Sequence, residues 1–167
     1  TLRSDIIWNR VNAFVEPTAR DRPHRQYEHL FLFSKSRWYS YDRSQLDGEQ
    51  DVWTIPIERS RRNEHSAPFP TQLVNRCVLT GSPPGGTVLD PFSGSGTTLE
   101  VSLGLGRNCV GIDLSSAYTS STVKRLEKAG CNRVPWEEVE QALDPEPEAW
   151  AEWPGNRQNF RKPRRKD

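Results

Sequence analysis

The sequence predicts an α/β fold in which parallel strands are flanked by helices, and two junctions carry this prediction. Thr87 to Asp90 is an apolar strand that runs directly into a glycine-rich turn at 91–96. Val110 to Asp113 is a second strand, and it ends in an acid. From residue 70 onward the order is helix, strand, helix, strand, helix, which is typical of parallel pairing.

The N-terminal third reads as strands joined by polar segments. Asp5 to Trp8 is a strand, and 9–25 is a polar loop that contains two prolines. Glu28 to Ser34 is a short, almost wholly apolar run, so we expect a buried strand there. Trp38 to Asp42 is expected to form the next strand, through a hairpin at 35–37.

The segment Val52 to Ile57 alternates between apolar and polar residues and is strand-like. Pro56 cannot donate to a ladder of backbone hydrogen bonds, so this strand is expected at the edge of a sheet.

Helical periodicity begins after Pro70. Leu73 pairs with Cys77 at i, i+4, as Val74 pairs with Val78, and this helix should end near Gly81. The segment 97–105 is the helix that follows the glycine-rich turn. The last predicted helix runs from Tyr118 to Ala129, with Gly130 as its C-terminal cap.

Composition sets broad limits on function. The net charge of +1 gives no nucleic-acid signature for the chain as a whole. Cys77, Cys109 and Cys131 are far apart, and no zinc pattern occurs. Cys77 and Cys109 lie in apolar runs, so we expect reduced core residues. The sequence shows no signal peptide and no long apolar segment, which favours a cytoplasmic protein without a membrane or metal partner.

The glycine-rich turn predicts a nucleotide-type cofactor site. Gly94 and Gly96 lack a Cβ, so backbone there can approach a ligand closely. Asp113, at the end of the next strand, is suited to accept hydrogen bonds from ribose hydroxyls. The dinucleotide fingerprint would need a glycine at Leu99, which argues against NAD or FAD. The alternative interpretation is an ordinary tight turn.

Two segments carry a resemblance to a known family. Asp90 to Thr98, with the sequence DPFSGSGTT, resembles the S-adenosyl-L-methionine (AdoMet) motif of amino-group DNA methyltransferases. His65 to Pro70 resembles the same family's H-x-A-x-F-P motif. The resemblance covers about residues 2–128. It implies a Rossmann-like AdoMet-dependent methyltransferase sheet with flanking helices, incomplete in this chain, and methyl transfer to adenine N6 or cytosine N4 of double-stranded DNA.

The same resemblance implies the residues that bind AdoMet. They lie in the two motifs and at the end of the following strand. They are His65, Ala67, Phe69, Pro70, Asp90, Phe92, Gly94, Gly96, Thr97, Thr98 and Asp113.

The family's catalytic motif, (D/S)-P-P-(Y/W/F), is not found in this sequence. Ser82 to Gly85 reads SPPG, without the aromatic residue, and is interpreted as a turn. In the permuted branch of the family the catalytic motif precedes the AdoMet motifs, and this chain would begin just after it. We therefore expect a piece of a longer protein or the product of a shortened gene, with no catalytic residue of its own. The missing N-terminal part or a partner chain would supply that motif.

Arginines at 20, 22 and 25 cluster in the long polar loop, with His24 among them. A loop of this kind beside the pocket could neutralise DNA phosphates. The alternative is a solvated loop of mixed charge, since Asp21 and Glu28 are close by.

The predicted organisation is a partial methyltransferase domain at 1–133 and a tail at 134–167. The domain divides into catalytic-side strands at 1–58 and an AdoMet-binding part at 64–130. The tail has seven acids and no base between Pro135 and Trp153, and six bases after Asn156. Such a tail is expected to fold back on itself or to stay mobile.

Several functions remain open at this stage. The first is a fragment of a DNA methyltransferase, with cytosine N4 slightly favoured because 16–35 resembles members that carry Ser-Pro-Pro-Tyr. The second is a non-catalytic remnant that binds AdoMet or DNA, or one half of a split enzyme. The third is a methyltransferase that acts on RNA or protein.

Overall fold

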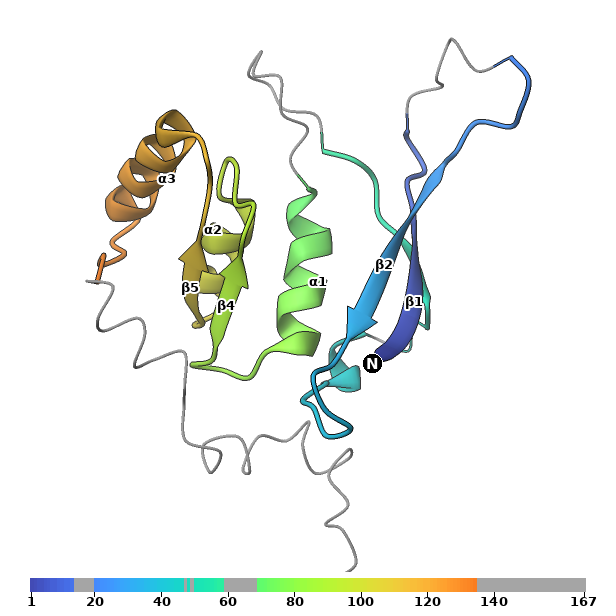
Figure 1. The fold of residues 1–167 in the computed structure, drawn as a ribbon, viewed down its shortest axis with the longest axis horizontal. Helices are drawn as coiled ribbons and strands as arrows, with labels where there is room; N and C mark the ends of the chain where they lie inside the picture. The colour runs from blue at the N-terminus through green and yellow to red at the C-terminus, as the bar shows by residue number, and fades with distance from the viewer. Residues whose placement is uncertain (14–19, 47, 49, 59–68, 135–167) are drawn as a thin grey trace, which may run out of the picture.

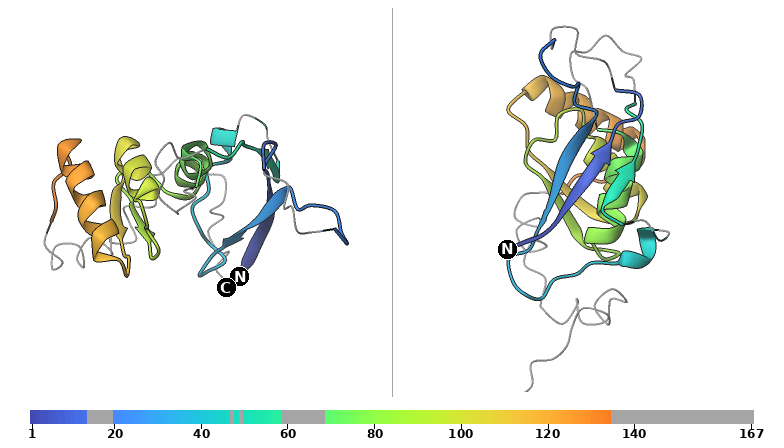
Figure 2. Two further views of the ribbon diagram at one scale, coloured as in Figure 1. Left: turned by 90° about the horizontal axis from the view of Figure 1, so that it is seen from above. Right: turned by 90° about the vertical axis from the view of Figure 1, so that its right-hand side faces the viewer.

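The computed structural model describes residues 1–13, 20–46, 48, 50–58 and 69–134. The described strands form two sheets, one with the order β2-β1-β3 and one with the order β4-β5. The helix α1 lies between them, as Figure 1 shows, and two further views are given in Figure 2. The predicted α/β class is confirmed.

In the first sheet the central strand is β1 (Leu2–Asn9). It pairs antiparallel with β2 (Tyr27–Phe33) and parallel with β3 (Val52–Thr54). The strand β3 lies at an edge of the described sheet, as the sequence predicts, but it ends at Thr54 rather than at Ile57. The indole N–H of Trp8 donates to the carbonyl of Ile55 at 2.7 Å, which holds the segment after β3 against β1.

Two expectations about the first sheet are wrong. The strand β2 exists, but it is an edge strand with alternating exposure, and Phe31 and Phe33 are 54% and 64% exposed. The segment 38–42 forms no strand. Its last residue, Asp42, donates its backbone N–H to Thr80 and accepts from Ser44 at the start of a short 3-10 helix, η1 (Arg43–Leu46). These contacts take the chain away from the sheet.

The second half alternates helices and strands as predicted. The helix α1 (Thr71–Gly81) precedes β4 (Thr87–Asp90), α2 (Thr97–Gly104) connects β4 to β5 (Asn108–Gly111), and α3 (Ser116–Lys128) follows β5. The two strands are parallel, with Asp90 opposite Gly111. The strand β5 thus ends at Gly111 rather than at Asp113. Gly130 follows α3 with φ +83°, a left-handed conformation that suits glycine at a helix end.

Two hydrophobic clusters meet at α1. Its residue Leu73 packs under the first sheet, whereas Val74 and Val78 pack with Val101 of α2. The cluster under the first sheet is Ile6, Trp8, Leu46, Trp53, Ile55 and Leu73. Because α1 contributes to both, it fixes the position of the second sheet relative to the first.

The cysteines are all free, but Cys77 is not a core residue as predicted. It is exposed, because the side of α1 on which it lies faces an open groove between the two clusters. Cys109 is partly buried. In the described ranges, no group of three His, Cys, Asp or Glu side chains could hold a metal ion, and no helix is long and apolar enough to cross a bilayer.

Candidate cofactor site

The candidate site forms where β4 and β5 end side by side. The carboxylate of Asp90 accepts a hydrogen bond from the backbone N–H of Phe92 at 3.0 Å, which turns the chain sharply after β4. The backbone N–H of Ser93 donates to the carbonyl of Ile112 at 2.9 Å. These bonds hold the glycine-rich turn against the residues that follow β5.

Asp113 joins this turn to the start of α3. One carboxylate oxygen accepts from the backbone N–H of Gly94 and the other from that of Ser115, each at 2.8 Å. Ser115 is the N-cap of α3, and its side chain accepts from the N–H of Tyr118. The acid predicted to bind ribose therefore also organises the loop around it. A carboxylate has about four acceptor sites, so it keeps acceptor capacity for a ligand.

The glycines of the site have different roles. Gly96 is the N-cap of α2 with φ +81°, and a Cβ there would lie 2.4 Å from Cγ2 of Thr122. A Cβ on Gly111 would lie 2.6 Å from a methyl group of Leu99. A Cβ on Gly94 would meet nothing closer than the carbonyl oxygen of Phe92 at 3.9 Å. Gly94 is thus the glycine whose backbone remains open to a ligand.

Apolar side chains stand exposed around the turn. Phe92 is 87% exposed, and Leu114 is fully exposed. Ile112 and Leu89 are about half exposed. Such surface next to polar backbone groups is suited to a ligand with one flat apolar part. Phe92 is among the residues predicted from the sequence, whereas Leu114 and Ile112 are not, although apolar residues on both sides of Asp113 were the available signal.

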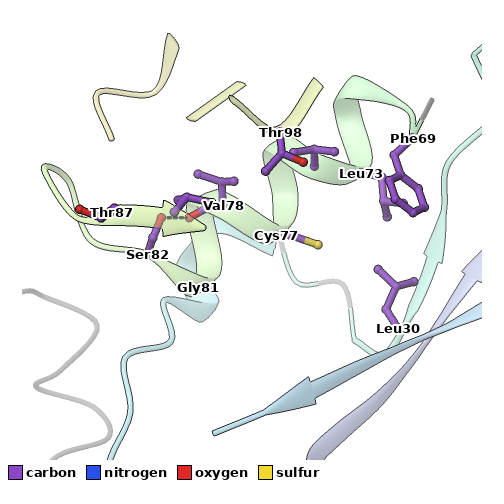
Figure 3. A pocket seen from close by; sticks show the side chains of 11 residues that line it. Leu30, Phe69, Leu73, Cys77, Val78, Gly81, Ser82, Thr87 and Thr98 are labelled. Carbon is purple, nitrogen blue, oxygen red and sulfur yellow. Dashed lines mark hydrogen bonds between the residues drawn. The ribbon is translucent and has the colours of Figure 1, made fainter. Parts of the chain in front are cut away.

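Two other predicted residues, Phe69 and Thr98, line a groove beside α1 (Figure 3). The groove has a volume of about 390 Å³ and an almost entirely apolar wall. Phe69 is 59% exposed, and its ring meets that of Trp8 edge to face at 6.4 Å. Leu30 from β2 lies across from Phe69 in Figure 3. The structure therefore places the predicted residues at two locations, the strand ends and this groove.

The remaining predicted cofactor residues are Thr97, Pro70, His65 and Ala67, and the structure describes the first two of them. Thr97 begins α2 and is partly exposed. Pro70 is fully buried at the N-cap of α1, where its carbonyl accepts from the N–H of Leu73. His65 and Ala67 lie outside the described residues.

The thiol of Cys77 faces the groove, as Figure 3 shows. The surrounding apolar side chains disfavour the charged thiolate and raise the pKa of Cys77 to about 11. The neutral thiol therefore forms part of the apolar wall at neutral pH.

The SPPG segment is a turn, as the sequence analysis interpreted it. Ser82 caps α1, and its hydroxyl donates to the carbonyl of Val78 at 2.6 Å. The backbone N–H of Gly86 donates to the carbonyl of Pro83, which closes the turn before β4. Arg107 also donates to the carbonyl of Ser82, and burial lowers the pKa of this guanidinium. The segment thus lies at the opposite end of β4 from the glycine-rich turn.

The predicted DNA-contacting arginines lie in the connection between β1 and β2. Arg20, Arg22 and Arg25 are exposed, and Arg22 pairs with Asp21 at 3.0 Å. Arg10, which the sequence analysis missed, anchors the end of this loop. It pairs with Glu28 at 2.6 Å and donates to the carbonyl of Arg25. The end of the loop that carries the exposed arginines is therefore held in place by Arg10.

Comparison with known proteins identifies the class to which this fold and site belong. The family model for N6/N4 DNA methylases matches residues 1–124. The type II methyltransferase M.SmaI of Serratia marcescens is 45% identical over 136 residues, which are 75% of this chain and 46% of that protein. The chain belongs to the DNA methylase family. It spans about half the length of the curated relatives that it matches.

Solved structures show the same fold. The cytosine-N4-specific PvuII DNA methyltransferase has a TM-score of 0.65 at 19% identity, over 83% of this chain and 55% of that one. The M1.HpyAVI–SAM complex has a TM-score of 0.60 at 24% identity, over 75% of this chain and 62% of that one. The predicted Rossmann-like methyltransferase fold is confirmed. AdoMet, the cofactor predicted from the sequence, is the ligand named for the second of these structures.

Proposed function

We propose that this chain is the AdoMet-binding part of a DNA methyltransferase that transfers a methyl group to an exocyclic amino group. The observation that carries the proposal is the hydrogen bond of 2.8 Å between Asp113 and the backbone N–H of Gly94. This bond holds the acid that follows β5 against the glycine-rich turn that follows β4, at the carboxyl ends of the two strands. Membership of the DNA methylase family supports the same function.

The residues at the strand ends fit AdoMet by their chemistry. The open backbone at Gly94 allows close approach, and the carboxylate of Asp113 can accept hydrogen bonds from ribose hydroxyls. Phe92 and Leu114 offer exposed apolar surface to the adenine ring. AdoMet supplies the electrophilic methyl group on a sulfonium. The protein has to hold the cofactor and place the amine of a flipped base in line with that methyl.

This chain contributes cofactor binding rather than base activation. Its sequence has no (D/S)-P-P-(Y/W/F) motif to accept the amine hydrogens and stack the base. The similar SPPG segment is a turn whose serine bonds to α1. We therefore assign the amine-orienting groups to polypeptide outside this chain, in an order that corresponds to the permuted branch.

Cytosine N4 is the favoured target, because the segment 16–35 resembles family members that carry Ser-Pro-Pro-Tyr. Adenine N6 is the alternative within the same family. A chain with the missing motif would be needed to decide between them, and analysis of the methylated nucleoside by mass spectrometry would give the answer.

A second candidate is a remnant that binds AdoMet without a catalytic partner, and the missing motif favours it. Calorimetry with AdoMet and the chain alone tests the function common to both candidates. We expect one cofactor per chain, and absence of binding would contradict the proposed function. Methylation restored by a polypeptide that carries the motif would favour the enzyme over the remnant.

A further inference from the structure

The helix α3 holds the glycine-rich turn through two side chains. The guanidinium of Arg125, in the last turn of α3, donates to the carbonyl of Ser95 at 2.5 Å, across 30 residues of sequence. The hydroxyl of Thr122, one turn earlier, donates to the carbonyl of Gly94 at 3.4 Å. Two successive carbonyls of the turn are therefore directed toward α3.

Arg125 also packs directly against the backbone of the turn. A Cβ on Gly96 would lie 3.2 Å from Nη2 of Arg125, so the guanidinium covers the residue at which α2 begins. The other partner of Arg125 is Glu100 of α2, at 3.4 Å, and both side chains of this ion pair are exposed. An ion pair with such exposure contributes little to stability. The bond to the carbonyl of Ser95 is therefore the contact of Arg125 that matters for the turn.

The direction of these carbonyls decides which groups the turn presents to a ligand. The described peptide bonds are all trans, and in a trans peptide the N–H and the C=O point in opposite directions. Because the carbonyl of Gly94 is directed toward α3, the N–H of Ser95 points away from α3. No described residue accepts a hydrogen bond from this N–H, and Ser95 is only partly buried. This donor is therefore available to a ligand at the turn.

We infer that Arg125 is a positioning residue for AdoMet, acting through Ser95 rather than on the cofactor itself. Its hydrogen bond keeps the turn in the conformation that leaves the N–H of Ser95 available beside the carboxylate of Asp113. The inference rests on the proposed function, in which AdoMet binds at this turn. Without Arg125 the cofactor would have to order the turn as it binds, which lowers its affinity.

Calorimetry with AdoMet and the full chain measures this effect. Arg125→Met keeps the length of the side chain and removes its donors. We expect the affinity to fall by about tenfold, the lower end of the range for a hydrogen bond to a charged group. Arg125→Lys keeps the charge and a donor, so it should recover part of the lost affinity.

Two variants are matched controls for Arg125→Met. Lys124→Met removes a positive charge from the adjacent position of α3, which lines the same pocket as Arg125 but makes no hydrogen bond to the turn among the described residues. Glu100→Gln removes the ion pair with Arg125 and leaves the bond to Ser95. Both should bind AdoMet like the wild type. Equal loss of affinity in Lys124→Met would assign the effect to net charge and overturn the positioning role.

Hydrogen exchange of the chain without AdoMet separates positioning from a general loss of stability. The amides of Gly94 and Gly96 donate to the carboxylate of Asp113 and the carbonyl of Ser93. Both should exchange faster in Arg125→Met than in the wild type, whereas the amides of β1 should keep their wild-type rates. Equally faster exchange in β1 would show a general destabilisation and overturn the proposal.

Two further results would overturn the positioning role: wild-type affinity in Arg125→Met, or unchanged exchange at the turn in that variant. In both cases the wild-type chain still binds AdoMet, and the proposed function stands. Absence of AdoMet binding by the wild-type chain would instead overturn the proposed function and the positioning role together. The two failures are therefore distinguishable.

Discussion

Asp113 accepts a hydrogen bond from the backbone N–H of Gly94 at 2.8 Å, across 19 residues of sequence. This bond joins the segment between β5 and α3 to the glycine-rich turn between β4 and α2. The same carboxylate holds the N–H of Ser115 before α3. One side chain therefore shapes the loop in which we propose that AdoMet binds. Its replacement should affect both the fold of the site and the affinity for AdoMet.

Asp113→Ala is expected to weaken AdoMet binding by about 1.5–3 kcal/mol, the range for a hydrogen bond to a charged group. Asp113→Asn keeps one acceptor oxygen and should weaken binding less than alanine does. Calorimetry with AdoMet measures both, and thermal unfolding without cofactor shows the structural part. Wild-type affinity in the alanine variant would contradict the assignment of Asp113.

Gly96→Ala should destabilise the chain more than Gly94→Ala. Both glycines have positive φ, which costs about 1–2 kcal/mol for an L-residue. Only at Gly96 does the new Cβ also meet Thr122, at 2.4 Å, and such overpacking costs about 1–3 kcal/mol more. Urea unfolding measures the difference. Adding Thr122→Ser to Gly96→Ala removes the contacting methyl and should restore part of the loss, whereas equal stability of the two glycine variants would contradict the predicted contact.

The chain alone should bind AdoMet without methylating DNA at a useful rate. It has no motif to accept the amine hydrogens, and Ser82 of the SPPG turn is buried and bonded to Val78. Incubation with labelled AdoMet and DNA of mixed sequence is the measurement. Robust incorporation that persists in an Asp113→Ala control would point to a contaminating enzyme. Incorporation lost in that control would show that this chain has a catalytic group that we have not identified.

Replacement of Arg20, Arg22 and Arg25 by alanine in a complete enzyme should weaken binding to all DNA sequences similarly. The three side chains are exposed in a loop anchored by Arg10 and Glu28, a position suited to phosphate contacts. The slope of log affinity against log salt should fall by about 0.9 for each lost contact. Fluorescence anisotropy at several salt concentrations measures this slope. A change in the methylated sequence would instead make these arginines base readers.

Cys77 should react slowly with thiol reagents although it is exposed. Its pKa of about 11 lies above the ordinary value of 9.0, so the reactive thiolate is scarce near neutral pH. In a variant with Cys109 and Cys131 replaced by serine, the labelling rate should rise about tenfold per pH unit from pH 8 to 10. Because the pKa of Cys77 is higher in the folded chain than in the unfolded chain, ionisation of this thiol opposes folding. The folded state therefore keeps its full stability below pH 9.0 and loses part of it as the pH rises toward 11. A labelling rate that levels off near pH 9 would contradict the apolar setting of the thiol.

The sequence by itself determined the second half of the fold. The i, i+4 apolar pairs of α1, the glycine-rich turn before α2 and Gly130 after α3 are local signals, and each element formed where they predicted it. Local signals suffice there because helix periodicity and positive-φ glycines constrain a few neighbouring residues. The two DNA methylase motifs likewise pointed to the family before any contact was known.

Only the tertiary structure decided which surfaces are covered. The apolar run of β2 predicts a buried strand, but burial depends on a neighbour, and among the described residues β2 has a strand on one side only. Cys77 has apolar neighbours in the sequence of α1 yet faces an open groove, because α1 packs against two separate clusters. The bond between Asp113 and Gly94 joins residues 19 positions apart, and no local pattern specifies it. Exposure and long-range hydrogen bonds come from the packing of whole elements, which residue periodicity does not encode.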